Sequence, residues 1–584
     1  MQILEAGSYS RANVKFASRF TEWCPETGKK ADLMFVQHML ASLKPDGHMA
    51  TIMPHGVLFR GGKEKLIREH FIKDDVIEAI ISLPSGLFYG TGIPACVLIM
   101  NKNKPDVLRG KVLFINADRE FAESKNQTKL RPEDIEKIDF VFTHKRELPK
   151  YSRLVDKSEI VDKHDYNLNI RRYVDNTPDP EPEDVQAHLI GGVPEGEVLA
   201  RQADFQKFGV KPESLFQPER PGYLAFKNIT SKADIKTRLE AEAALIKTFA
   251  THRAALEDWW KVAREDFAQL RDGKKLPDVR QELLTTLKGK LIPLGVLDEF
   301  QSAAIFVNWW QNIRYDLKTS ISSGWHHALI PDSYLIAEFF QTEADAIEVL
   351  EAKIAEAQSE LAEAVETAQE VAAYEPDEDE TVTASVIKKV LKELIDDLSA
   401  TPGESAKKEL EKLEAQKNVI TTIEECIKTT KAALKSLTDE LEHKLQLKRL
   451  GVVEFKAESE LLLEDVHQKL ATLDESKKDE KKKINALKKD KAILEARLAK
   501  TDALLASIGG QLTEPKAKAL ILKKLFDLAG QILDRYLNAE RRHLVKAIDN
   551  LWDKYAVSSR MLESERTKLL TTLDGMLHGL GYFA

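Results

Sequence analysis

Four short apolar runs, separated by helical stretches, constrain the fold of this chain more than any other feature. The runs cover residues 48–53, 76–83, 96–100 and 112–115, and they read as buried strands. Two stretches between and before them, residues 34–43 and 63–71, have helical spacing instead. Strands that alternate with helices predict an α/β sheet. Because four strands are too few for a complete doubly wound sheet, residues 1–125 are predicted to form only part of such a domain.

The rest of the chain is predicted to be mainly helical and to fall into four further regions. Residues 126–185 are polar, with prolines among acids near their end, and are predicted to be irregular, as in a linker. Residues 186–340 are predicted to form a helical domain with its tryptophan pairs as packing anchors. Residues 341–510 are predicted to form a coiled-coil arm, because apolar residues recur at intervals of three and four. Residues 511–584 are predicted to form a C-terminal helical unit.

Composition excludes several classes of protein. The net charge of −9 over 584 residues shows that the chain is not a polycation that coats nucleic acid, so DNA contacts must come from local patches or from a partner. The three cysteines lie far apart and lack metal-ligand spacing, which predicts no metal site and a reducing compartment. Without a long apolar run or a signal-peptide pattern, the chain is expected to be cytoplasmic and to have no membrane span.

Lysine runs occur inside the predicted arm, at residues 477–478, 481–483 and 488–489. They interleave with acids and with apolar residues of the heptad, and no aromatic residues lie among them. This pattern favours the solvated face of a coiled coil over the alternative, which is DNA binding.

Residues 31–103, with the stretch ISLPSGLFYGTGIPACVLIM, resemble the region downstream of the catalytic motif in adenine-N6 DNA methyltransferases. The family that they resemble most is the modification (M) subunit of type I restriction-modification systems, of which DYNLNIRRY at residues 165–173 is a further landmark. The resemblance implies a Rossmann-like methyltransferase half-domain. It also implies methyl transfer from S-adenosylmethionine to adenine N6 in DNA, and assembly with a specificity subunit and a restriction subunit.

The resemblance further implies a target-base pocket around residues 88–92. In the family an aromatic side chain at this place, shortly before the next strand, packs against the flipped adenine. Phe88 is the first candidate and Tyr89 is the alternative, while Gly90 and Gly92 would let the backbone approach the base closely. The plain structural interpretation is a core phenylalanine followed by a tight turn.

The same glycines also fit the methyl-donor loop of these enzymes, F-x-G-x-G. Such a loop should open a helix, so that its amides face the donor. Ile93, Pro94 and the β-rich run that follows predict a strand instead, and this argues against a donor loop here.

No catalytic residue is assigned to this chain. In the family, an Asn or Asp followed by Pro-Pro and an aromatic polarises the amine, and no Pro-Pro pair occurs in the sequence. His55 is interpreted as loop structure, because the N6 reaction of the family needs no histidine. We therefore expect a truncated product, or one half of a split enzyme whose donor-binding N-terminal half is a separate partner. The alternative is a catalytically inactive coiled-coil scaffold.

Five further residues are candidates for weaker contacts. By the resemblance, Asp32 and Phe35 open the helix that runs alongside the methyl donor; a helix N-cap for Asp32 and a core position for Phe35 are the alternative. Arg60, Lys63 and Lys65 cluster near a helix start, and they are either contacts to DNA phosphates or ordinary exposed charges.

Overall fold

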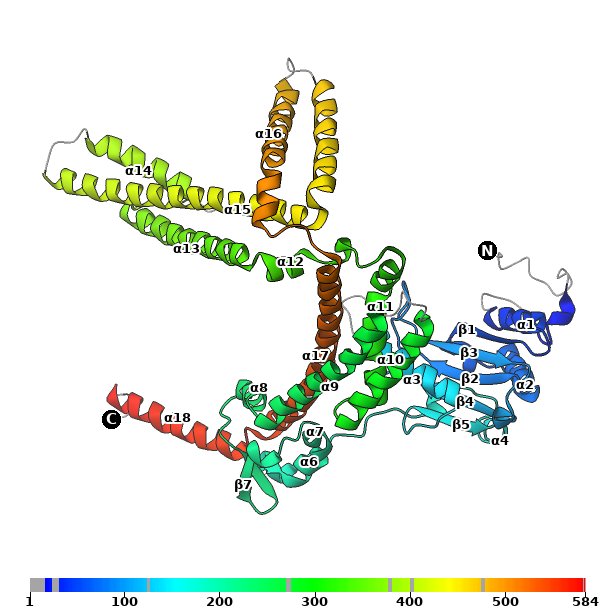
Figure 1. Cartoon of the computed structure of the whole chain (residues 1–584). Coiled ribbons are helices and arrows are strands. Elements are labelled where there is room, and N and C mark those ends of the chain that lie inside the picture. The colour runs from blue at the N-terminus through cyan, green and yellow to red at the C-terminus, as the bar shows by residue number, and fades with distance from the viewer. Residues whose placement is uncertain are drawn as a thin grey trace. The chain divides into compact units, whose positions relative to one another are not determined.

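The computed structural model describes residues 16–23, 31–122, 127–268, 275–376, 381–399, 404–473, 478–580 and 582. The chain divides into two compact units: Met1–Arg314 together with Leu528–Ala584, and Tyr315–Asp527 (Figure 1). Within the described ranges, no helix is long and apolar enough to cross a lipid bilayer.

A mixed five-stranded sheet organises the N-terminal part of the first unit. Its strands are β1 (His48–Pro54), β2 (Ile77–Ser82), β3 (Ala95–Asn101), β4 (Lys111–Asn116) and β5 (Ser152–Asp156), in the order β1-β3-β2-β4-β5. Strands β2 and β4 are parallel, and the other neighbouring strands are antiparallel. Every residue of β2 is buried, as expected for a strand that is covered on both faces.

Helices cover both faces of this sheet and form a core on each. On one face, α1 (Asp32–Ser42), α2 (Lys63–Lys73) and α4 (Lys157–Asp162) contribute to a cluster in which Val36, Ile67 and Phe114 are fully buried. On the other face, Val141 of α3 (Pro132–His144) packs in a second cluster with Leu113. The sheet is therefore the centre of a three-layered fold, and loops at its edges can hold side chains in fixed positions.

The elements predicted between residues 34 and 115 are confirmed: two helices and four strands lie where the sequence placed them. The prediction for residues 126–185 was wrong, because this segment contains α3, β5 and α4. The fifth strand is a short edge strand in which only Ser152 and Val155 are buried, so it lacks the continuous apolar run that marked the others. Residues 174–184 do lack helix and strand, as the prolines predicted.

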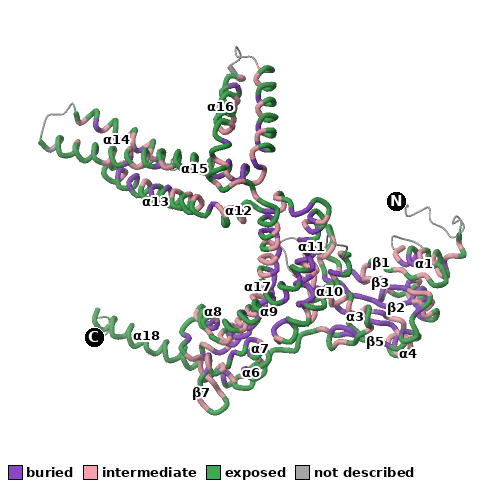
Figure 2. The backbone as a smooth tube through the Cα atoms, viewed as in Figure 1, coloured by how far each residue is buried: buried purple, intermediate pink, exposed green. Residues whose placement is uncertain are grey.

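The remainder of the first unit is mainly helical. It contains α8 (Lys232–Glu240), α9 (Ala243–Ala268), α10 (Leu276–Leu291), α18 (Ser559–Gly579) and parts of α11 (Glu299–Ser323) and α17 (Glu514–Tyr555). The rings of Trp259 and Trp309 are almost completely buried, with centroids 5.3 Å apart, and so serve as the packing anchors that were predicted. By contrast, α18 is exposed along nearly its whole length (Figure 2).

Long helices make up the second unit. Helix α13 (Gln341–Val371) packs against α14 (Ala384–Ser399) and α15 (Glu404–Ala471), around a core that contains Ala368, Leu391 and Ile420. Helix α16 (Lys478–Ser507) packs against α15. At Gly451, where φ is +71°, α15 bends sharply. From the sequence alone, helices are expected over residues 404–447, 456–507 and 515–578. The break between the first two falls at this bend, whereas residues 456–507 are divided between α15 and α16, and residues 515–578 between α17 and α18.

Candidate functional site

The loop at residues 83–94 joins β2 to β3 and carries the candidate base-pocket residues. Backbone hydrogen bonds close its base, from Leu83 N–H to the carbonyl of Ala95 and from His55 N–H to the carbonyl of Pro94 (2.9 and 3.3 Å). The loop leads into strand β3, so the prediction of a strand rather than a helix after these glycines is confirmed. This geometry does not provide the helix N-terminus that a donor loop requires.

A second segment holds the middle of this loop. Thr128 donates from its backbone N–H to the carbonyl of Gly86 and from its hydroxyl to that of Ser85 (3.1 and 2.7 Å), and the Gln127 amide donates to the carbonyl of Leu87 (2.7 Å). Because these bonds fix the residues just before the aromatic pair, the loop presents that pair from a well-anchored base.

The two aromatic residues of the loop lie in different environments. Phe88 is partly buried and packs against the core that contains Ile81 and Leu83, whereas Tyr89 is 91% exposed. Gly90 has φ +75°, a conformation that a side chain rarely adopts, and an added Cβ at Gly90 or Gly92 would meet open space. Phe88 is therefore fixed by packing, and Tyr89 is the ring that solvent or a ligand can reach directly.

The candidate cofactor contacts, Asp32 and Phe35, do not occupy the N-cap and core positions that were the alternative interpretation. Asp32 is the first residue of α1, and the N-cap is Ala31, which makes no side-chain capping bond. Phe35 is 47% exposed, so it is not a core residue. The Asp32 carboxylate lies 3.4 Å from the guanidinium of Arg60.

Each of the three candidate phosphate ligands already contacts a carboxylate. Arg60 lies 3.4 Å from both Asp32 and Glu64, and its side chain covers Gly56. Lys63 lies 3.2 Å from Glu22, and Lys65 lies 2.6 Å from Asp165. A DNA phosphate at this position would have to displace a carboxylate from each cation, so these pairs weaken the case for phosphate contacts.

A polar cluster at the carboxyl ends of the parallel strands β2 and β4 was not predicted as a site. After β4, Asp118 accepts hydrogen bonds from the guanidinium of Arg171 (3.0 Å) and from the amide of Asn176 (2.6 Å). Asn116 donates to the carbonyl of Val174 (2.9 Å). Ligands of open α/β sheets bind at this edge. The cluster was missed because its members are more than fifty residues apart, although Arg171 lies within the family landmark at residues 165–173.

His55 connects this edge of the sheet to the loop that carries Phe88. Its Nε2 donates to the carbonyl of Ala95 (3.0 Å), and the Ser82 hydroxyl lies 3.3 Å from the same nitrogen. Burial lowers the pKa of His55 below its ordinary value, even though the Ala95 carbonyl and the Asp118 charge oppose the shift. The imidazole is therefore neutral at pH 7 and acts as a hydrogen-bonding brace.

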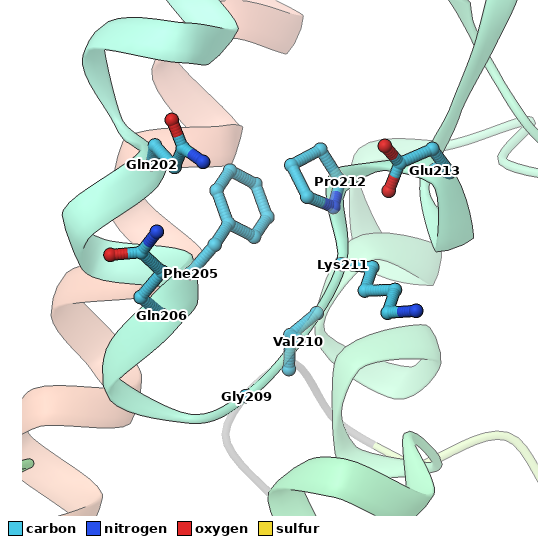
Figure 3. Close-up of a pocket in the computed structure, with 8 residues that line it drawn as sticks. All are labelled: Gln202, Phe205, Gln206, Gly209, Val210, Lys211, Pro212 and Glu213. Atoms are coloured by element: carbon cyan, nitrogen blue, oxygen red, sulfur yellow. The ribbon is translucent and has the colours of Figure 1, made fainter.

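A pocket of about 650 Å³ lies apart from these residues, in the helical part of the first unit (Figure 3). The ring of Phe205 from α7 (Gln202–Lys207) points toward Pro212, and Lys211 and Glu213 provide the only charges of its lining. None of the candidate site residues contributes to it. We therefore place the candidate site at the sheet edge and not in this pocket.

Comparisons with known proteins give a matching family and several relatives. Residues 6–181 match the family described as N-6 DNA Methylase. The chain is 43% identical, over 26% of its length and 26% of the relative, to the methylase subunit of the type I restriction enzyme MjaVIII of Methanocaldococcus jannaschii. It is 34% identical, over 30% of its length and 32% of the relative, to the methylase subunit of the type I restriction enzyme MpnII of Mycoplasma pneumoniae.

The chain is also similar, over part of its length, to a solved structure. The type I restriction-modification system methyltransferase subunit from Streptococcus thermophilus is 41% identical over 27% of this chain and 33% of that one, with a TM-score of 0.26. The alignments to the two curated relatives span 26% and 32% of those relatives' own lengths.

Proposed function

We propose, from the relation of residues 6–181 to the N-6 DNA methylases, that this chain is part of a type I modification subunit that methylates adenine N6 in DNA. The observation that carries the proposal is the agreement between this relation and the anchored loop of residues 83–94, which presents an aromatic pair at the edge of the sheet. An enzyme that modifies a base must take it out of the duplex and hold it by stacking, and an aromatic on a rigid loop serves this purpose.

In this proposal Phe88 forms the wall of the base pocket, with Tyr89 as the alternative, and Gly90 and Gly92 leave room for the base. S-adenosylmethionine is the proposed methyl donor. Among the residues that the structure describes, the glycine-bearing loop enters a strand and Asp32 is bound to Arg60, so neither feature forms a donor pocket by itself. We propose that a separate N-terminal methyltransferase half supplies the donor site.

The proposed partners are DNA, a specificity subunit and a restriction subunit. Support for a protein partner comes from α18, where Leu562, Leu569, Leu573 and Met576 are each at least half exposed. Their spacing of seven, four and three residues places them on one side of the helix, as in a helix that docks on other helices. Arg60, Lys63 and Lys65 are also proposed to contact DNA phosphates. Each contact requires the phosphate to displace the carboxylate that the cation now pairs with.

Methyl transfer in a reconstituted complex tests the proposal. The chain is combined with a complementing N-terminal half and a specificity subunit, and incorporation of labelled methyl groups into DNA is measured. The variant Phe88→Leu keeps an apolar side chain against the core but removes the stacking ring, and it should lower the rate by about tenfold or more, since base stacking contributes about 1–3 kcal/mol. The matched variant Tyr89→Leu should change the rate little.

The outcomes separate three cases. If Tyr89→Leu abolishes transfer and Phe88→Leu does not, the stacking role belongs to Tyr89. If neither variant changes the rate, the loop is not the base pocket. If no combination of subunits transfers methyl groups, the second candidate function holds: a catalytically inactive scaffold, which the long helices of the second unit and the uncovered α18 favour.

A further inference from the structure

The second segment of α15 (residues 452–471) and α16 form an antiparallel hairpin in the second unit (Figure 1). Ile484 and Thr501 of α16 are buried, and Leu487, Leu494 and Leu498 are half-buried, so these residues define the inner side of the helix. Because an α-helix turns once every 3.6 residues or so, the inner side also fixes which residues lie on the outer side.

Among residues 481–503, the outer side of α16 carries lysines and no carboxylates. We call these residues the lysine face, and all of them are exposed: Lys481, Lys482, Lys489 and Lys500. The other residues on this side are uncharged and mostly small: Asn485, Ala492, Ile493, Ala496, Ala499 and Ala503. In the sequence the lysines interleave with acids, and only the helical geometry separates them.

The acids of α16 lie toward its inner side. Asp502 pairs with Lys456 of α15 at 3.0 Å, across the hairpin. Glu495 pairs with Lys491, which is half-buried, at 3.8 Å. Asp502 is therefore engaged across the hairpin and Glu495 within α16, and the exposed Asp490 lies nearer the inner side of the helix than the lysine face.

The other helix of the hairpin has the opposite charge. Residues 452–471 expose five carboxylates: Glu454, Glu458, Glu460, Glu464 and Asp465. The hairpin thus has a basic helix beside an acidic one, and the acidic helix disfavours any approach of a polyanion except from the α16 side. In a chain with a net charge of −9, such a local concentration of lysines is the kind of patch through which a polyanion can bind.

We propose that the lysine face of α16 binds the phosphate backbone of duplex DNA without reading its sequence. This inference rests on the proposed function, in which the chain acts on DNA. At about 1.5 Å per residue, Lys481 and Lys500 lie about 28 Å apart along the helix, a length comparable with about eight base pairs of duplex. The alanines between the lysines let the helix come close to the backbone, and lysine ammonium groups act as point charges toward phosphates.

Fluorescence anisotropy of the full chain with a labelled duplex of mixed sequence, roughly 30 base pairs long, tests this inference between about 50 and 200 mM salt. The variant K481Q/K482Q/K489Q/K500Q should weaken binding by about tenfold or more. It should also reduce the slope of log affinity against log salt by about 0.9 for each phosphate that is no longer neutralised. The matched control K389Q/K392Q/K408Q/K412Q removes four exposed lysines from α14 and α15 and should bind like the wild type. The variant K481R/K482R/K489R/K500R should retain binding.

Equal affinities of the lysine-face and control variants would overturn the inference. The inference would also be overturned if the wild type bound phosphatidylserine vesicles but not duplex DNA. It would likewise be overturned if the wild type formed a dimer at low salt that was lost in the lysine-face variant, while the DNA affinity stayed the same. The test is independent of methyl transfer. If a reconstituted complex showed no transferase activity, the proposed function would fail. A loss of DNA binding measured in the lysine-face variant would still stand.

Discussion

At the scale of single residues, Gly90 and Gly92 differ although both occur in the same short loop. Only Gly90 has a positive φ, at +75°, and neither position is crowded. We expect Gly90→Ala to strain the loop by about 1–2 kcal/mol, because the left-handed conformation brings Cβ against the following carbonyl oxygen. Hydrogen exchange of peptides from residues 83–94 should then accelerate by about five- to thirtyfold. Gly92→Ala is the matched control, and equal exchange in both variants would contradict the assignment.

Single residues also show why the candidate site could be predicted only in part. Phe88 and Tyr89 are adjacent in the sequence, and no local pattern distinguishes the ring that packs from the ring that is 91% exposed; the contacts with β2 decide it. Arg171 lies within the landmark at residues 165–173, but Asp118 lies on a different loop, so their 3.0 Å contact depends on how β4 and the segment after α4 come together. Local sequence predicts which residues are available, and tertiary packing decides which of them meet.

At the scale of elements, strands and helices were predicted well where the apolar pattern was strong. Strands β1 to β4 and helices α1 and α2 have continuous apolar runs or clear helical spacing, and their observed bounds agree with prediction to within a few residues. α3 was missed because one of its sides is polar, and β5 because it is short, mixes polar and apolar residues and lies at the edge of the sheet. The bend in α15 at Gly451 falls in the gap between the helices that the sequence predicts over residues 404–447 and 456–507.

This bend allows a prediction about α15. At Gly451 an added Cβ would lie 2.6 Å from the side chain of Gln511, and φ is +71°. Gln511 donates to the carbonyl of Leu450 (3.1 Å), and Lys448 donates to the carbonyl of Gly510 (2.9 Å), so the bend is held on both sides. We expect Gly451→Ala to loosen these contacts and to raise hydrogen exchange around residues 445–455 and 508–512.

The matched control for this variant is Gly289→Ala, in the exposed part of α10. No atom lies within 4 Å of an added Cβ there, so this substitution should stabilise its helix by up to about 1 kcal/mol. Unchanged exchange at the bend in Gly451→Ala would show that α15 tolerates a side chain at this position.

At the scale of the whole molecule, the two units are expected to unfold as separate transitions. Their cores differ, since the first unit contains six of the seven tryptophans and the second contains only Trp325. Tryptophan fluorescence therefore reports mainly on the first unit, whereas far-ultraviolet circular dichroism reports on both. In urea the two signals should give midpoints that do not coincide. Coincident curves would show that the chain unfolds as one cooperative block.

The two parts of the first unit are synthesised at different times, because the second unit lies between them in the sequence. Lys207 pairs with Glu540 at 2.6 Å, and Arg253 with Asp534 at 3.0 Å, so the helical part is completed by residues that follow the entire second unit in the sequence. At about 5–20 residues per second, the nascent chain waits roughly 10–40 s for them. During that interval the apolar surface that α17 later covers must be shielded by other means. A dependence on chaperones, and aggregation of prematurely terminated products, would therefore arise during synthesis and not from the finished protein.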